Sequence, residues 1–209
     1  MPLAVDNSRR IEFIGNSITC GYGIEGGGSG LMAKYENFYR TYASLAAQSL
    51  GAEYHTVAQS GIGMFRNAGG SQAGDAETMY HFYNQTMRYN KDLLWDFNSF
   101  IPQVVTVNLG TNDFFGDGVN DSLFVERYIK FVDTLRQKYN TAKLVLLTGP
   151  MYPNLDLDIA VQAVVAHHKQ LGDTNIYFFG LSKQTGELGY GGDFHPSIDQ
   201  GKKKCFRTG

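Results

Sequence analysis

The sequence predicts a three-layer αβα sandwich built on a five-stranded parallel sheet, an arrangement of the flavodoxin-like type. Five short apolar runs recur along the 209 residues, and segments of helical character lie between them. The runs are mostly continuous rather than alternating, which is typical of strands buried on both faces of a parallel sheet. Strand–helix alternation with right-handed crossovers then places helices on both faces of that sheet.

The five predicted strands are rich in β-branched and aromatic residues, which favour extended structure. They cover residues 11–14 (IEFI), 54–58 (YHTVA), 103–109 (QVVTVNL), 143–148 (KLVLLT) and 175–179 (NIYFF). Their short length suits a buried sheet better than buried helices. We therefore expect each run to form one strand of the central sheet.

Three segments between these strands are predicted to be helices. Residues 37–51 end on Gly51, a frequent helix stop, and residues 157–172 also end on glycine. The segment 121–140 begins at Asp121, a candidate N-cap. One face of this segment carries a stripe of large apolar side chains, Phe124, Tyr128, Phe131, Leu135 and Tyr139. That stripe is expected to face the core.

The stretch from residue 62 to residue 100 is harder to assign. Two segments within it, 75–86 and 91–97, have the composition of short helices around a long surface excursion. The glycine-rich segment 23–30 follows the first strand closely, so we expect a mobile loop near the site rather than an interdomain linker. It is not a phosphate-binding P-loop, because no Gly-Lys-Ser/Thr follows it.

The composition limits the classes of function. The chain has 18 Lys and Arg residues against 20 Asp and Glu residues, and 43% of its residues are hydrophobic. Neither disorder nor a polyanion-binding surface is indicated, so nucleic acid is not an expected partner. The basic cluster at 202–204 is typical of a solvated tail. No apolar run approaches the roughly 18 residues that span a bilayer, and no membrane association is expected.

The cysteines and the N-terminal residues give little functional information. Cys20 and Cys205 cannot form a disulfide scaffold, and neither belongs to a C-x-x-C pair. The first ten residues lack the charged start and apolar centre of a secretion signal. The chain as given is therefore expected in the cytoplasm, or outside the cell if a signal was removed.

Reactive and donor residues follow several of the predicted strands. Ser17 comes after the first strand, Gly61 after the second and Asn112 after the third, while Asp193 and His195 lie beyond the fifth. In a doubly wound sheet these loops converge on one edge, so residues far apart in the sequence can meet there. Acyl transfer needs a hydroxyl nucleophile, an imidazole base and hydrogen-bond donors for the developing oxyanion. The residues at this edge supply all three.

We predict Ser17 as the nucleophile and His195 as the general base. Asp193 is expected to orient the imidazole, through either its carboxylate or its backbone carbonyl. The oxyanion hole is predicted from the backbone N–H groups of Ser17 and Gly61 and the side-chain amide of Asn112, because glycine lets a backbone donor approach without a Cβ in the way. Taken alone, Ser17, Gly61 and Asn112 also fit ordinary turns or helix caps, and His195 also fits a surface residue. The prediction therefore depends on all of them falling at one edge.

The four blocks resemble the SGNH (GDSL-type) hydrolase superfamily. GNSIT (15–19) is similar to its serine block, SGIG (60–63) to its glycine block, GTND (110–113) to its asparagine block and DFHPS (193–197) to its histidine block. The resemblance spans residues 11–197. With their flanking residues, IEFIGNSITCGYG and SGIGMFRN, the blocks are most similar to the catalytic domain of carbohydrate esterase family 2, whose members remove acetyl groups from sugars and plant polysaccharides.

This resemblance implies hydrolysis of short acyl esters, particularly O-acetyl groups on carbohydrates, without a metal or an organic cofactor. Phe194 is then expected to be an apolar wall or sugar platform, with an ordinary packed aromatic as the alternative. A broader lipase, thioesterase or arylesterase shares the same blocks. A noncatalytic flavodoxin-like binding module is an alternative from another class. A metal-dependent hydrolase is disfavoured, because His167 and His168 are expected to be surface residues on different faces of a helix.

Two residues depart from the superfamily pattern. Asn16 stands where the broader superfamily has aspartate, and this is expected to be tolerated because that residue does not attack the substrate. Gly192 occupies the usual position of the triad aspartate, three residues before the histidine. Asp193 is therefore treated as a supporting residue, since in carbohydrate esterase family 2 a backbone carbonyl can orient the histidine.

The family's flanking elements are also not evident in the sequence, neither its N-terminal β-sandwich domain nor its amphipathic helix after the histidine block. We predict a single catalytic domain over residues 1–209, with loosely ordered tails at 1–10 and 198–209. The second tail offers too few apolar residues for a docking stripe. One face of the sheet is therefore expected to be short of cover, or to be covered by a second subunit in a homo-oligomer.

Overall fold

A five-stranded parallel sheet forms the centre of the protein. The computed structural model describes residues 8–30, 33–88, 90–116, 119–151 and 155–205. The strands are β1 (Arg10–Gly15), β2 (Glu53–Ala58), β5 (Val104–Asn108), β6 (Lys143–Thr148) and β7 (Ile176–Gly180). They pair in parallel in the order β2-β1-β5-β6-β7. This confirms the predicted sheet, and every predicted strand boundary lies within one residue of the observed one.

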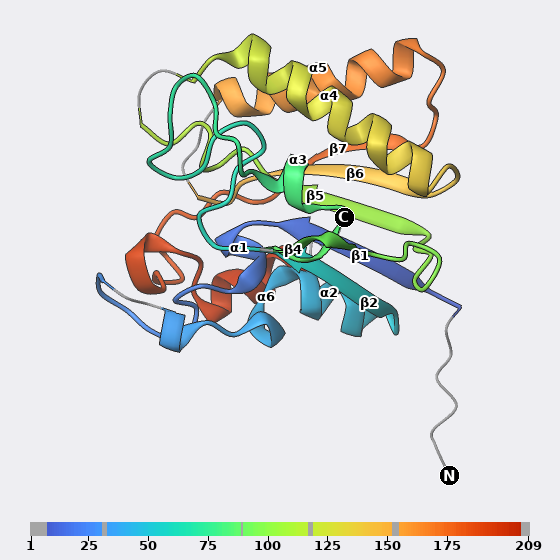
Figure 1. Ribbon diagram of the computed structural model, residues 1–209. Helices are drawn as coiled ribbons and strands as arrows, with labels where there is room; N and C mark the ends of the chain where they lie inside the picture. The colour runs from blue at the N-terminus through green and yellow to red at the C-terminus, as the bar shows by residue number, and fades with distance from the viewer. Residues whose placement is uncertain (1–7, 31–32, 89, 117–118, 152–154, 206–209) are drawn as a thin grey trace.

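Helices cover both faces of the sheet, which confirms the three-layer prediction (Figure 1). Helices α4 (Asp121–Lys138) and α5 (Leu155–Gln170) lie on one face, and α2 (Tyr42–Leu50) and α6 (Ile198–Cys205) lie on the other. The predicted apolar stripe of α4 is buried in the core between that helix and the sheet. In the part of the chain that is described, no helix is long and apolar enough to cross a membrane.

The helix ends show how local sequence sets the boundaries. The side chain of Asn120, not that of Asp121, caps α4, because its oxygen accepts a hydrogen bond from the Leu123 N–H at 3.0 Å. The predicted helix at 37–51 is divided into a 3-10 turn, η2 (Phe38–Arg40), and α2. Gly51 ends α2 as expected, with a positive φ of 58° that favours glycine.

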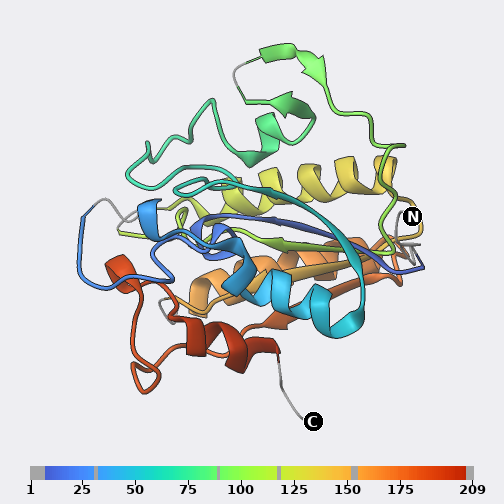
Figure 2. The same ribbon diagram turned by 90° about the horizontal axis from the view of Figure 1, so that it is seen from below.

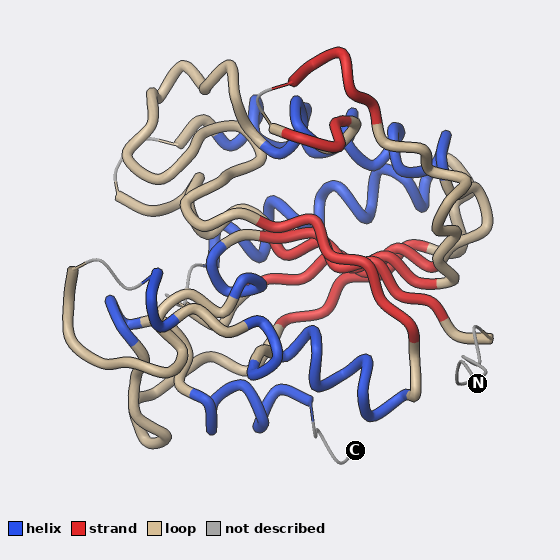
Figure 3. Tube along the Cα trace, turned by 60° about the horizontal axis from the view of Figure 1, so that its bottom comes forward, coloured by secondary structure: helices blue, strands red, loops and turns tan. Residues whose placement is uncertain are grey.

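The segment between β2 and β5 contains one short helix and a separate hairpin. Helix α3 (Met79–Phe82) is followed by β3 (Gln85–Met87) and β4 (Asn90–Leu94), which pair antiparallel and lie apart from the main sheet (Figures 2 and 3). The helix expected at 91–97 is therefore wrong. All the residues of β4 are exposed, so its sequence carries no pattern of burial from which to distinguish a strand from a helix.

The C-terminal segment is the largest correction to the sequence analysis. Residues 198–205 form α6, which packs against α2, so this part of the predicted tail is a helix and the sheet face is not short of cover. Arg10, placed in the other predicted tail, already belongs to β1. Helix α6 packs through Gly201 and Gln200, both buried, rather than through an apolar stripe. The reason for expecting a second subunit is thereby removed.

The order of the strands fixes the position of the site. From β1 the chain goes outward to β2 and then returns across the sheet to β5, so the order reverses between β1 and β5. Ligands of open α/β sheets bind outside the carboxyl ends of the strands at such a reversal. The loops that follow the strands gather at the left of Figure 1. The same end of the molecule carries two further short 3-10 turns, η1 (Ala33–Tyr35) and η3 (Gly192–Phe194).

Candidate active site

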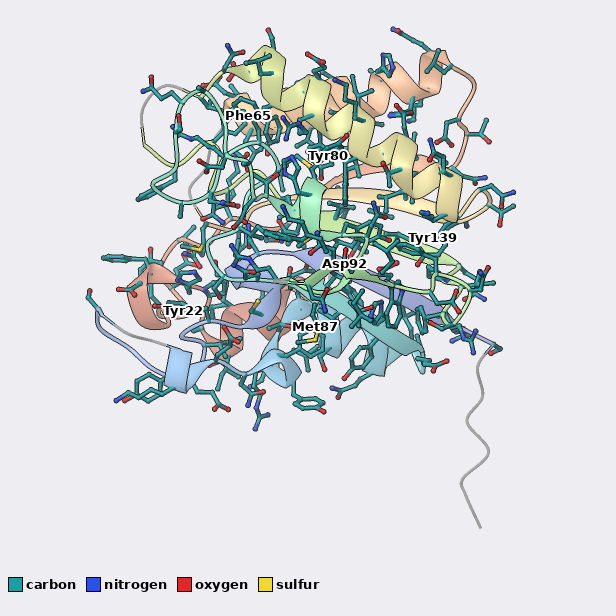
Figure 4. All side chains as sticks on the ribbon, in the orientation of Figure 1. Tyr22, Phe65, Tyr80, Met87, Asp92 and Tyr139 are labelled. Carbon is teal, nitrogen blue, oxygen red and sulfur yellow. The ribbon has the colours of Figure 1, made fainter. Side chains whose placement is uncertain are left out.

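A cavity of about 400 Å³ opens at the carboxyl edge of the sheet. Its lining brings together Ser17, Gly61, Asn112, Asp193 and His195, which the sequence analysis had selected from four separate loops. Figure 4 shows Tyr22, which also lines the cavity, at this end of the molecule, and Tyr139 of the α4 C-cap at the other end. The predicted convergence of the loops is therefore present in the structure.

Ser17 is the first residue of α1 (Ser17–Cys20), directly after β1. The preceding Asn16 is the N-cap, and its side-chain oxygen accepts from the Ile18 N–H at 3.0 Å. Asparagine and aspartate are about equally good at this position, which explains how Asn16 can replace the aspartate of the superfamily pattern. Gly15 leaves no room for a side chain, because a Cβ there would lie 2.7 Å from the Cβ of Thr19. The turn from strand to helix is therefore tight.

The side chains of Ser17 and His195 lie within hydrogen-bond distance although they are far apart in the sequence. The distance between Ser17 Oγ and His195 Nε2 is 2.8 Å, and His195 Nδ1 lies 3.1 Å from the carbonyl oxygen of Gly192. A carbonyl oxygen can only accept, so the second contact requires a proton on Nδ1. In the neutral ring, Nε2 is then the acceptor that faces the serine hydroxyl, which is the arrangement a general base needs.

The surroundings of His195 favour its neutral form. Burial lowers the pKa of this imidazole, and the backbone carbonyls of Gly192 and Asp193 oppose that shift, with a smaller contribution from the Asp193 carboxylate. The ring of Tyr22 packs against the imidazole with 4.9 Å between the ring centroids. A neutral imidazole accepts a proton, so this environment keeps the histidine ready to act as a base at pH values below its ordinary pKa.

The Asp193 carboxylate does not contact the imidazole, contrary to one of the two expected arrangements. It accepts hydrogen bonds from the Gly30 N–H at 3.2 Å and from the Tyr22 hydroxyl at 3.3 Å. The carbonyl that holds His195 Nδ1 belongs to Gly192, one residue before the expected position. Asp193 and Phe194 both have positive φ values, 49° and 59°, which turn the carboxylate toward the glycine-rich loop. Its hydrogen bonds are therefore with the glycine-rich loop and with Tyr22 just before that loop.

Three hydrogen-bond donors are available at the cavity. Within the described residues, neither the Ser17 N–H nor the Gly61 N–H donates a hydrogen bond to the protein. Asn112 Nδ2 donates one hydrogen to the carbonyl of Ile62 at 2.7 Å. A side-chain amide carries two hydrogens, so the second remains for a ligand. All three groups belong to residues that line the cavity, so each is available to a ligand there.

Phe194 lies beside the cavity rather than in its lining. Its side chain is 62% exposed and meets Tyr190 edge to face, with 5.7 Å between the ring centroids. This excludes the ordinary packed aromatic that was its alternative interpretation. Sequence reasoning did not select six other residues that line the cavity, Tyr22, Ser60, Ala68, Thr111, Phe115 and Met151. Ser60 and Thr111 lie inside the glycine and asparagine blocks, and Tyr22, Ala68 and Phe115 follow a block within a few residues, so the carboxyl-edge argument itself could have identified them.

One of the two adjacent histidines of α5 also differs from expectation. His168 is buried and not a surface residue, and burial lowers the pKa of its imidazole. His168 Nδ1 lies 4.0 Å from Asp133 of the neighbouring helix. His168 thus belongs to the packing between α4 and α5, and neither histidine is among the residues that line the cavity.

The fold and site combine a reversal point in a parallel sheet with a serine–histidine pair among N–H donors, an arrangement that is typical of serine hydrolases. Comparison with known families agrees. The model of the GDSL-like lipase/acylhydrolase family matches residues 13–199. The chain belongs to that family.

Several proteins similar to this chain are carbohydrate-active. The cellulase/esterase CelE of Acetivibrio thermocellus is 39% identical over 195 residues, which cover 91% of this chain and 24% of that protein. An acetylxylan esterase/glucomannan deacetylase of Cellvibrio japonicus is 29% identical over 203 residues, which cover 96% of this chain and 55% of that protein. The chain thus spans between a quarter and about half of the length of these relatives.

Solved structures of family two carbohydrate esterases have the same fold. The enzyme from Clostridium thermocellum in complex with cellohexaose superposes with a TM-score of 0.88 at 38% identity, covering 94% of this chain and 61% of that one. The enzyme from Corynascus thermopiles, solved with a carbohydrate binding domain, gives 0.87 at 29% identity, covering 98% of this chain and 65% of that one. The resemblance to carbohydrate esterase family 2 is confirmed.

Proposed function

We propose that this protein is a serine esterase that hydrolyses short acyl esters, chiefly O-acetyl groups on carbohydrates. The observation that carries the proposal is the 2.8 Å contact between Ser17 Oγ and His195 Nε2 in a cavity that also presents three N–H donors. The relatives named as acetylxylan esterase and glucomannan deacetylase support acetyl groups on polysaccharides as the substrate class. The two exposed rings of Tyr190 and Phe194 beside the cavity are suited to contact a sugar.

The proposed reaction has two halves. His195 Nε2 removes the proton from Ser17 as the serine oxygen attacks the ester carbonyl, and the N–H groups of Ser17, Gly61 and Asn112 bind the oxyanion. The imidazolium then gives its proton to the leaving sugar oxygen, which leaves an acyl-serine. Water, deprotonated by the same imidazole, then attacks the acyl carbon, and the imidazolium returns that proton to the Ser17 oxygen as its bond to the acyl group breaks and acetate leaves. The Gly192 carbonyl keeps the ring oriented throughout.

This orientation differs from a serine–histidine–aspartate triad in one respect. The group on Nδ1 is a neutral carbonyl, and among the residues that the structure describes no carboxylate hydrogen-bonds to the ring. A carbonyl dipole stabilises the imidazolium less than a full negative charge does. In this proposal His195 therefore acts with Ser17 as a pair, and Asp193 supports the pair through the loop that it binds.

The proposal is tested with a panel of esters on the wild-type protein and two serine variants. Acetylated xylan fragments, acetylated sugars and aryl esters from acetyl to octanoyl are compared. Wild type is expected to prefer acetyl esters, and Ser17→Ala is expected to lose about 10³–10⁶-fold in kcat. Ser60→Ala is the matched control, because it removes a hydroxyl from the same cavity, where Ser60 contacts Glu36. It is expected to retain activity within a few fold.

Three outcomes would contradict the proposal in distinguishable ways. Higher activity on octanoyl than on acetyl esters would indicate a broader lipase. Turnover that survives Ser17→Ala would exclude Ser17 as the nucleophile. An absence of both turnover and covalent labelling of Ser17 by an organophosphate would indicate a binding module instead of an enzyme.

A further inference from the structure

A buried carboxylate adjoins the candidate oxyanion hole. Asp113, the residue after Asn112, is completely buried. Its oxygens accept from three consecutive backbone N–H groups, those of Met64 at 3.0 Å, Phe65 at 2.7 Å and Arg66 at 2.9 Å. These residues belong to the loop that begins at Gly61. One side chain of the loop after β5 thus binds the loop after β2.

The loop after β2 binds back through Arg66. This arginine is also buried, and its guanidinium donates to the backbone carbonyls of Asp113 at 2.8 Å and Phe115 at 2.8 Å. Asn112 adds a third connection, through its amide and the Ile62 carbonyl. The two loops are therefore joined in both directions by charged side chains that hydrogen-bond to backbone. Such charge-assisted bonds are stronger than neutral ones and have little solvent to compete with them.

The two loops also approach without free space between them. A Cβ on Gly63 would lie 2.8 Å from Oδ2 of Asp113, closer than side-chain atoms pack, and it would also overlap the Arg66 carbonyl. Gly61 is held from the other side, because its carbonyl accepts from the Ala68 N–H at 2.8 Å. Close packing at Gly63 and the hydrogen bond of Gly61 thus leave the two loops little room to shift relative to each other.

These loops carry two of the three proposed oxyanion donors, the Gly61 N–H and the Asn112 amide. An oxyanion hole works only if its donors point in advance at the place where charge develops. A misplacement of about 1 Å can cost about a hundredfold in rate. We infer that Asp113, with Arg66, is a positioning residue that sets the separation and direction of the Gly61 and Asn112 donors. The inference rests on the proposed function and adds a group that does not touch the substrate.

The test is Asp113→Asn, which keeps the shape of the side chain but replaces one accepting oxygen with a donor. At least one of the three loop N–H groups then faces an NH₂ group instead of an acceptor. We expect kcat per folded molecule to fall about ten- to a hundredfold, with KM changed less than about threefold. Asn112→Ala, which removes a donor outright, is expected to lose about 10²–10³-fold. Concentrations of folded enzyme come from titration of Ser17 with an organophosphate.

A matched control separates positioning from general loss of stability. Glu12 in β1 is also a completely buried carboxylate, which accepts from the Tyr83 hydroxyl at 3.2 Å, and it does not line the cavity. Glu12→Gln is expected to lower the melting temperature while leaving kcat per folded molecule within about twofold of wild type. If Asp113→Asn does not fold, Arg66→Lys tests the same connection, because one ammonium cannot replace the fork that binds two carbonyls. It is expected to lose about three- to tenfold in kcat.

Two further measurements report on positioning itself. An alkyl boronic acid forms a tetrahedral adduct on the serine and mimics the oxyanion, so its affinity is expected to fall by the same factor as kcat. Hydrogen exchange of the Ala68 amide, which Asp113 does not bind, is expected to accelerate in Asp113→Asn and not in Glu12→Gln. This readout needs no catalytic activity, so it distinguishes failure of the inference from failure of the proposed function. The inference would be overturned if the folded Asp113→Asn or Arg66→Lys variant kept the wild-type kcat. It would also be overturned if that variant kept the wild-type boronate affinity and the wild-type hydrogen exchange.

Discussion

Replacement of the Asp193 carboxylate tests whether the proposed catalytic pair needs a third member. The cleanest change is Asp193→Asn. Asp193 has a positive φ of 49°, a conformation that asparagine adopts readily and alanine does not. Asparagine therefore removes the charge without adding backbone strain. The kcat of Asp193→Ala would instead reflect the loss of charge, the loss of hydrogen bonds and the backbone strain together.

The magnitude follows from what the carboxylate contacts. Its partners are the Gly30 N–H at 3.2 Å and the Tyr22 hydroxyl at 3.3 Å, and not the imidazole. Asparagine keeps one accepting oxygen, so about one of these two hydrogen bonds is lost, and an ordinary hydrogen bond contributes about 0.5–1.5 kcal/mol. If all of that were expressed in the transition state, kcat would fall by no more than about tenfold, since 1.4 kcal/mol corresponds to a factor of ten. A triad aspartate would cost about 10⁴-fold under the same change.

The assay is steady-state hydrolysis of an aryl acetate by wild type, Asp193→Asn and His195→Ala. We expect the asparagine variant to retain at least about a tenth of the wild-type kcat, and the histidine variant to lose about as much as Ser17→Ala. The carboxylate contributes least among the groups that raise the pKa of His195. Its removal is therefore expected to move the acid limb of the pH profile only slightly, and toward lower pH.

A loss of kcat in Asp193→Asn that approached the loss in His195→Ala would refute this reasoning. It would mean that the carboxylate reaches the imidazole during the reaction, despite its position on the glycine-rich loop. A crystal structure of the acyl-enzyme would then be expected to show that rearrangement.

Two other predictions concern pH and the C-terminal helix. Because burial lowers the pKa of His195 and the neutral imidazole is the base, kcat/KM should decrease as the pH falls through a midpoint below the ordinary histidine value of about 6.5; a midpoint above that value in a wild-type pH profile would contradict the burial argument. Gly201→Ala should destabilise the fold by about 1–3 kcal/mol in denaturant unfolding, because a Cβ there would lie 2.6 Å from the Arg40 carbonyl of the 3-10 turn before α2. Helix propensity alone predicts that alanine at position 201 stabilises the fold. The control is Lys202→Ala, on the exposed side of α6. A Gly201→Ala variant more stable than wild type would contradict the packing of α6 on that turn.

The central sheet could be predicted from the sequence because its inner strands β1, β5 and β6 are largely buried, and its edge strands β2 and β7 still carry short β-branched and aromatic runs. Burial leaves a continuous apolar run such as 143–148, whose limits are visible without any knowledge of its neighbours. The hairpin strand at 90–94 had no such signal, since every one of its residues is exposed. Helix α6 was missed although it has buried residues, because those residues are not large and apolar. It packs through Gly201 and Gln200, and close backbone approach does not appear in an apolar pattern.

The site likewise has features that the sequence predicts and features that only the tertiary structure decides. The sequence alone determined which residues could meet, because parallel strands deliver their following loops to one edge, and Ser17, Gly61, Asn112 and His195 all come from such loops or lie beyond the last strand. Only the tertiary structure decided which atoms face each other. The left-handed backbone at Asp193 and Phe194 turns a carboxylate away from the imidazole and brings the Gly192 carbonyl to it. Such a choice depends on contacts with a loop about 160 residues earlier in the chain, and no local pattern encodes it.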